Sequence, residues 1–126
     1  MERAKGEYIL IVEDDIEVSS LINDILTSFN YNCVVVEDGK SALEIYSSNE
    51  PKFALVLSDL GLSKLGGVEL FEQLYKINPQ IKFIAMSGFG HQDVGDSLQA
   101  KGVKAFISKP FRIENLLKTI KDILDD

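Results

Sequence analysis

The stretch Phe53-Ala-Leu-Val-Leu-Ser58-Asp59 joins an apolar run to an acidic residue. A short apolar run of this kind, bounded by polar residues, predicts a strand buried on both faces of a parallel sheet. In open α/β sheets, ligands bind at the edge formed by the carboxyl ends of the strands. We therefore expect the Asp59 carboxylate to emerge at a functional edge of a parallel sheet.

Three other apolar runs also end at polar residues. In chain order they are Tyr8–Val12 before Glu13 and Asp14, Lys82–Met86 before Ser87, and Ala105–Ser108 before Lys109. Because the carboxyl ends of parallel strands share one edge, these residues would bring carboxylates, a hydroxyl and an ammonium group together.

Extended apolar runs alternate five times with segments of helical period, which predicts βαβ units and one parallel sheet. The strand before Asp59 is predicted at Phe53–Ser58, and a fifth strand is predicted at Asn32–Val36. The helices are predicted at Ile16–Phe29, Lys40–Ser48, Val68–Ile77, Asp93–Lys101 and Ile113–Leu124. In the first helix, we expect an apolar stripe that packs on the sheet, formed by Ile16, Ser20, Leu21, Ile22, Ile25 and Leu26.

Composition narrows the class of protein. The chain has 126 residues, of which 45% are hydrophobic, which suits a single globular domain. Its net charge of −7 disfavours direct binding to nucleic acid. No apolar run approaches the ~20 residues of a membrane span, and residues 1–6 lack the apolar stretch of a secretory signal. The single cysteine, Cys33, is expected to be a packed thiol, and we expect a cytoplasmic protein without membrane contact.

Four motifs occur in a fixed order along the chain: Ile-Val-Glu13-Asp14, Leu-Ser-Asp59-Leu-Gly61, Met86-Ser87-Gly88 and Ser108-Lys109-Pro110-Phe111. Together they resemble the receiver (response-regulator) domain of two-component signalling. The resemblance implies a flavodoxin-like (βα)5 fold with a doubly wound, five-stranded parallel sheet in the order 2-1-3-4-5. It also implies a receiver domain over residues 8–126, preceded by a flexible tail of residues 1–7.

The resemblance assigns a role to each acidic residue. Asp59 would be the phosphoacceptor, and Asp14 and Asp59 would bind Mg²⁺ directly together with the backbone carbonyl of Gly61. Glu13 would reach the ion through a water molecule. Mg²⁺ prefers oxygen ligands and keeps several waters, so the set is suitable. Because the carboxylates repel one another without metal, we expect at least one raised pKa among them.

The resemblance also assigns roles to residues on the later strands. Ser87 would donate its hydroxyl to a phosphoryl oxygen. Lys109 would pair first with the acidic cluster and then with the phosphoryl group, and the Lys109–Pro110 peptide bond would be cis. Phe106 would be the switch aromatic, which turns inward when Ser87 moves toward the phosphoryl group.

Some residues depart from the usual receiver pattern. Ser63 replaces a common proline and Gly66-Gly67 follow it, which predicts a looser loop before the third helix. Gly61 has no side chain to direct a water, and the bulky Phe89 could shield the phosphoryl group, so we expect slow self-dephosphorylation. His91 lies in a polar loop and is expected to be a surface residue rather than a phosphohistidine.

The implied function is a signalling phosphoacceptor that catalyses its own phosphorylation and dephosphorylation but turns over no outside metabolite. A histidine kinase or phosphotransfer protein would supply the phosphoryl group, docking on the first helix near Ile16, Val18 and Ser19. Output would pass through the surface of the fourth helix, fifth strand and fifth helix. The protein would be a monomer or a phosphorylation-dependent dimer.

Two other hypotheses compete with this function. A pseudo-receiver would keep the fold and bind a partner without phosphorylation, but it has no need for Asp14, Asp59, Ser87 and Lys109 together. An α/β phosphatase would need an Asp-x-Asp motif on the nucleophile strand, and a flavin-binding protein would need a Ser/Thr/Gly-rich loop after the first strand. The acidic segment after Val12 cannot cradle phosphate, and no Gly-x-x-x-x-Gly-Lys loop occurs.

Overall fold

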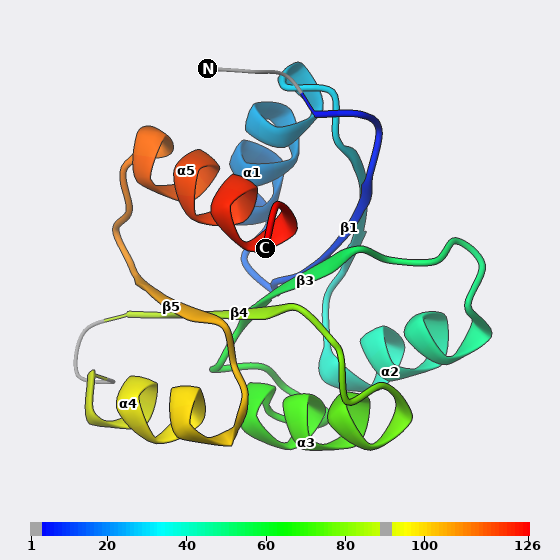
Figure 1. Ribbon diagram of the computed structural model, residues 1–126. Helices are drawn as coiled ribbons and strands as arrows, with labels where there is room; N and C mark the ends of the chain where they lie inside the picture. Colours follow the sequence, from blue (N-terminus) through cyan, green and yellow to red (C-terminus); the bar gives the residue numbers. More distant parts are fainter. Residues whose placement is uncertain (1–3, 89–91) are drawn as a thin grey trace.

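A computed structural model describes residues 4–88 and 92–126, and the side chains of residues 92–95 are left out of the description. One five-stranded parallel sheet runs through the molecule in the order β2-β1-β3-β4-β5 (Figure 1). Its strands are β1 (Tyr8–Val12), β2 (Asn32–Val36), β3 (Leu55–Asp59), β4 (Phe83–Ser87) and β5 (Ala105–Ser108). The strand order reverses beside β1, and open α/β sheets bind ligands at such a switch point. The predicted fold and strand order are confirmed.

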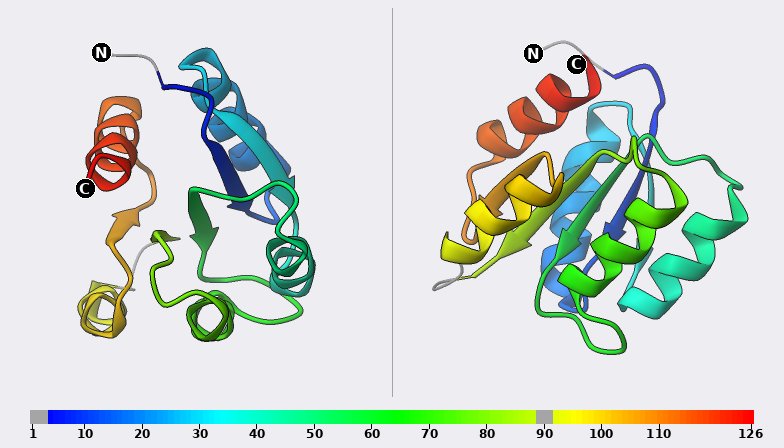
Figure 2. Two further views of the ribbon diagram at one scale, coloured as in Figure 1. Left: turned by 45° about the vertical axis from the view of Figure 1, so that its right-hand side comes forward. Right: turned by 60° about the horizontal axis from the view of Figure 1, so that its bottom comes forward.

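Helices lie on both faces of this sheet. They are α1 (Ile16–Ser28), α2 (Gly39–Ser48), α3 (Gly67–Ile77), α4 (Gln92–Lys101) and α5 (Ile113–Leu124). Helices α1 and α5 cover one face, and α2, α3 and α4 cover the other, as Figures 1 and 2 show from three directions.

The predicted bounds differ from the observed ones by at most two residues, and β3 shows why. This strand begins at Leu55 rather than at Phe53. Phe53 is buried, but its ring stacks on Tyr46 and meets Tyr8 edge to face before the strand begins. The apolar character of Phe53 therefore indicated that the residue is buried, but not that it pairs within the strand.

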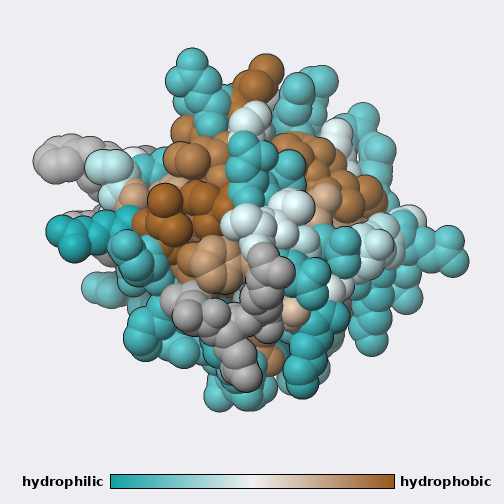
Figure 3. Space-filling view, turned by 90° about the horizontal axis from the view of Figure 1, so that it is seen from above, coloured by the Kyte–Doolittle hydropathy of each residue, from teal (hydrophilic) through white to brown (hydrophobic). Residues whose placement is uncertain are grey.

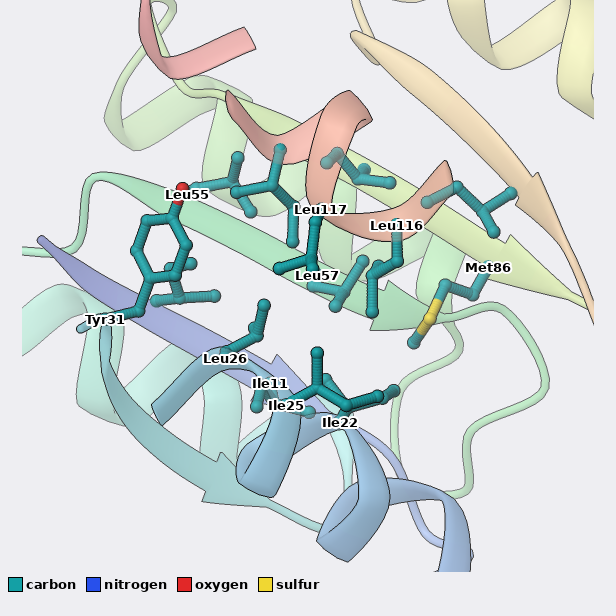
Figure 4. Packing of buried hydrophobic residues seen from close by; sticks show 14 residues of the cluster. Ile11, Ile22, Ile25, Leu26, Tyr31, Leu55, Leu57, Met86, Leu116 and Leu117 are labelled. Carbon is teal, nitrogen blue, oxygen red and sulfur yellow. The ribbon is translucent and has the colours of Figure 1, made fainter. Parts of the chain in front are cut away.

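The core between the sheet and helices α1 and α5 is made of aliphatic side chains (Figure 4). Ile22, Ile25 and Leu26 of α1 face Leu116 and Leu117 of α5 across the sheet residues. The stripe predicted for α1 is only partly right, because Ile16, Ser20 and Leu21 are exposed. Residues three and four apart share a helix face, so burial of residues 19, 22, 25 and 26 turns residues 16, 20 and 21 outward.

A second core lies under α2, α3 and α4. Leu10, Val12 and Val56 point to this side, alternating with strand residues that point to the first core. The rings of Phe71 and Phe83 pack edge to face at 5.2 Å between centroids. Both faces of the central strands are thus buried, as a parallel sheet requires.

Two sequence expectations concern the region around β2. Cys33 is half-buried against the first core, and burial raises the pKa of its thiol to about 11, which agrees with a packed thiol. In the expected flexible tail, the Ala4 N–H donates to the Phe29 carbonyl and the Asn32 amide donates to the Gly6 carbonyl. The flexibility of residues 1–7 stays a prediction, and these contacts argue against it for residues 4–7.

Among the described helices, none has the length and apolar character of a membrane span.

Candidate functional site

The carboxyl ends of β1, β3, β4 and β5 are held in line by backbone pairing. Val12 pairs with Ser58, Asp59 with Met86 and Ser87 with Ser108. Just beyond the strands, the Leu60 N–H donates to the Met86 carbonyl at 2.9 Å, and the Lys109 N–H donates to the Ser87 carbonyl at 2.7 Å. The side chains that follow these strands therefore meet at one edge, as predicted.

Three carboxylates gather at this edge. One carboxylate oxygen from each of Glu13, Asp14 and Asp59 lies within 4.8 Å of the others. Glu13 and Asp59 are buried, with 2% and 9% of their surface exposed, whereas Asp14 is open to solvent. A Cβ atom at Gly61 would lie 3.5 Å from Asp59 Oδ2, so the chain after β3 stays beside the carboxylate. These hard oxygen donors, one of them open to water, could hold a divalent cation such as Mg²⁺.

An ammonium group neutralises part of this acidic cluster. Lys109 Nζ donates to Glu13 Oε1 and lies 3.1 Å from Asp59 Oδ1. The Lys109–Pro110 bond is cis, as the resemblance implied, and Glu50–Pro51 is a second cis bond that the sequence did not predict. Lys109 thus links the ends of β1 and β3 through charge.

Electrostatics at the cluster follow from burial and pairing. Burial raises the pKa of Glu13, and the charge of Asp59 adds to that rise; hydrogen bonds from Lys109 and from the Asp15 N–H oppose it. The predicted raised pKa is confirmed, but burial rather than carboxylate repulsion is its largest cause. For Lys109, burial lowers the pKa, yet pairing with Glu13 and Asp59 outweighs burial and raises it. Each member of the pair therefore favours the charged form of the other, against the effect of burial.

Local sequence features hold the acidic residues in place. Asp15 caps α1, because its Oδ1 accepts from the N–H groups of Glu17 at 3.0 Å and Val18 at 3.3 Å. This role was not predicted, although an Asp just before an apolar helical period is an N-cap signal. The first residue of α3, Gly67, lies so close to β3 that a Cβ atom there would be 2.6 Å from the Asp59 carbonyl oxygen. Caps and close backbone contacts thus fix both sides of the site.

The remaining predicted residues lie where the sequence placed them. Ser87 ends β4 and is buried at the edge of the sheet. Phe106 lies in the middle of β5, is partly buried and packs against the second core. The switch roles of Ser87 and Phe106 stay predictions. Phe89 and His91, and the expectations attached to them, lie outside the described residues.

Comparison with known proteins agrees with this geometry. The family model for the response regulator receiver domain matches residues 9–121. The chemotaxis protein CheY of Bacillus subtilis is 34% identical over 119 residues, covering 93% of this chain and 97% of that relative. The transcriptional regulatory protein GlrR of Escherichia coli is 32% identical over 123 residues, 96% of this chain. The chain spans only 27% of the length of GlrR.

A solved structure extends the likeness to three dimensions. One chain of the CheX–CheY–BeF3–Mg²⁺ complex of Borrelia burgdorferi superposes with a TM-score of 0.86 at 24% identity, covering 93% of this chain and 88% of that one. This likeness supports the fold. Together with the family match across most of the sequence, it leads to one conclusion: the chain belongs to the response regulator receiver domain family.

Proposed function

We propose that Asp59 accepts a phosphoryl group from the phosphohistidine of a histidine kinase or phosphotransfer protein, with Mg²⁺ bound beside it. The observation that carries this proposal is the buried Asp59 carboxylate, which lies within a three-carboxylate cluster and 3.1 Å from the Lys109 ammonium. Asp14, Asp59 and the Gly61 carbonyl would hold the ion, with Glu13 acting through a water. The oxygen donors of the cluster and the Mg²⁺ in the solved CheY complex support this choice of ion.

The transfer exchanges one bond for another. An Asp59 carboxylate oxygen attacks phosphorus as the P–N bond of the phosphohistidine breaks, and the imidazole leaves with the electron pair and is protonated. When bound, Mg²⁺ supplies charge neutralisation for the phosphoryl oxygens. Before the transfer, the Lys109 ammonium lies beside the Asp59 carboxylate, with Nζ 3.1 Å from Oδ1. Its three N–H donors then turn to the phosphoryl oxygens, where the Ser87 hydroxyl donates as well.

The donor would dock on an apolar surface beside the site. A pocket of about 360 Å³ is lined by Val18, Leu21, Lys109, Pro110, Phe111 and Ile113. Three apolar side chains around α1 and the start of α5 are exposed: Ile16 at 70%, Leu21 at 51% and Ile113 at 47%. Figure 3, which views the α1 and α5 side, shows apolar side chains gathered among hydrophilic ones.

The proposed docking surface for the phosphoryl donor differs in one residue from the surface that the sequence predicted. Ser19 is buried and its hydroxyl donates to the Ile16 carbonyl at 3.2 Å, so it does not belong to the docking surface. Leu21 and Ile113, which the sequence did not assign to docking, take its place.

Output from the site would depend on the new charge at Asp59. A phosphoryl group adds negative charge and acceptor oxygens, which would draw Ser87 and Lys109 toward it and shift an existing equilibrium between two surface states. Phe106 on β5 would carry this shift to the surface of α4, β5 and α5. An output partner, or a second copy of the chain, would recognise that surface.

Intact mass spectrometry after incubation with acetyl phosphate tests the proposal. We expect one added phosphoryl group on the wild type in the presence of Mg²⁺, and none when Mg²⁺ is removed. The Asp59→Asn variant, which keeps the size and shape of the side chain, should gain nothing. An adduct that persists on Asp59→Asn would overturn Asp59 as acceptor. A wild type that stays unmodified under pulse labelling would favour a binding module that works without phosphorylation.

A further inference from the structure

The loop between β3 and α3 holds an unusual backbone conformation. Lys64 has a φ of 48° and Leu65 has a φ of 84°, so two successive non-glycine residues occupy the left-handed region. L side chains disfavour this region, and such residues persist only where the surrounding structure holds them. The loop nevertheless places its glycines at residues 66 and 67, just after the two left-handed positions.

The start of α2 holds these two residues. The Lys40 N–H donates to the Lys64 carbonyl at 2.9 Å. Gly39, the first residue of α2, is buried against the Leu65 carbonyl, and a Cβ atom at residue 39 would overlap that carbonyl oxygen. The Leu65 side chain also packs against the second core. The β3–α3 loop can therefore lie against α2 because residue 39 has no side chain.

The other end of the same loop lies at the acidic site. The Gly67 N–H donates to the Leu60 carbonyl at 3.2 Å and closes the loop at its base. Gly61 is the residue after Leu60, and a Cβ atom on it would lie 3.5 Å from Asp59 Oδ2. The loop of residues 61–66 thus leaves β3 beside the Asp59 carboxylate, touches the first turn of α2 at Lys64 and Leu65, and ends at α3.

We propose that Gly39 is a positioning residue for the metal site, acting through Leu65. By admitting the Leu65 carbonyl against α2, Gly39 keeps the loop in the left-handed conformation that sets Gly61 beside Asp59. A side chain at residue 39 displaces the Leu65 carbonyl, and with it the segment that carries the Gly61 carbonyl. This inference rests on the proposed binding of Mg²⁺ by Asp14, Asp59 and Gly61.

The test compares Mg²⁺ affinity with thermal stability in Gly39→Ala. Mg²⁺ is titrated into metal-free protein and the dissociation constant is read from backbone amide NMR shifts, with Tm measured on the same samples. We expect the Mg²⁺ dissociation constant to rise about tenfold, the lower end of what loss of an outer-shell partner costs a metal site. A second variant, Leu65→Ala, removes the packed side chain from the loop without adding an overlap, and should weaken Mg²⁺ binding in the same direction.

The matched control is Ile45→Ala, which removes a partly buried side chain from α2. Its Tm should fall while its Mg²⁺ dissociation constant stays within about twofold of wild type, because distant sites act independently. Unchanged Mg²⁺ affinity in Gly39→Ala would overturn the positioning role alone. If Gly39→Ala does not fold, unchanged affinity in Leu65→Ala overturns it instead. A wild type without Mg²⁺ binding would overturn both the metal site and this inference.

Discussion

At the residue scale, the Glu13–Lys109 pair shows how burial and charge compete. Burial raises the pKa of Glu13 above its ordinary 4.5, and the Lys109 hydrogen bond lowers it again. A carboxyl group with a raised folded pKa contributes stability below its unfolded pKa, and that contribution is lost as pH rises through the folded pKa. Lys109 limits this loss by stabilising the ionised form.

The Lys109→Gln variant removes that support. We expect the pKa of Glu13 in the metal-free protein to rise further, and stability to fall more steeply as pH increases above 4.5. Carboxyl ¹³C NMR titration measures the pKa, and thermal melts across the same pH range measure the stability. Lys104→Gln, at an exposed lysine of the same chain, is the control and should leave the Glu13 titration unchanged. A Glu13 pKa that falls in Lys109→Gln would show that the pairing is misassigned.

At the element scale, Gly67 at the start of α3 serves close packing. The sequence predicted a loose loop from Ser63 and the pair Gly66-Gly67. In the structure the Lys64 carbonyl accepts from Lys40, and Gly67 lies against the end of β3. These contacts argue against a loose loop. Gly67 is needed for close approach to the backbone of β3 and not for a positive φ.

The Gly67→Ala variant tests this close approach. Its Cβ atom would lie 2.6 Å from the Asp59 carbonyl oxygen and 2.7 Å from Leu60 Cα, both parts of the backbone. We expect the free energy of unfolding to fall by about 1–3 kcal/mol, the usual cost of overpacking, although alanine favours helix. Urea denaturation measures the change. Gly61→Ala, whose Cβ meets Asp59 Oδ2 at an ordinary 3.5 Å, should change stability by no more than about 0.5 kcal/mol. Equal stability of the two variants would contradict the packing argument.

At the scale of the whole molecule, the proposed catalytic edge and the docking surface are separable. Leu21 is 51% exposed beside the pocket that Lys109 lines, whereas Ile77, also 51% exposed, lies at the far end of α3. Leu21→Glu should slow phosphoryl transfer from an autophosphorylated histidine kinase about tenfold, because an apolar anchor is lost from the interface. Transfer from acetyl phosphate should not change. Ile77→Glu is the matched control and should behave as wild type with both donors. Equal slowing of both donors by Leu21→Glu would place the effect in the site and not in docking.

The sequence by itself determined the fold and which residues lie at the acidic edge of the sheet. Apolar runs that end at Asp59, Ser87 and Lys109 are local signals, and in a parallel sheet every such run ends at the same edge. The cis bond before Pro110 was implied by the resemblance that the motif Ser108-Lys109-Pro110-Phe111 carries. These features need only the order of residues along the chain.

The tertiary structure decided what depends on contacts between distant residues. The contact of Gly39 with Leu65, the burial of Glu13 and the exposure of Leu21 all arise when elements pack, and no local pattern contains them. The sequence showed which residues of α1 are apolar, but which of them face the core depends on how the helix is rotated against the sheet and α5. The physical reason is that burial and charge pairing are properties of the assembled surfaces.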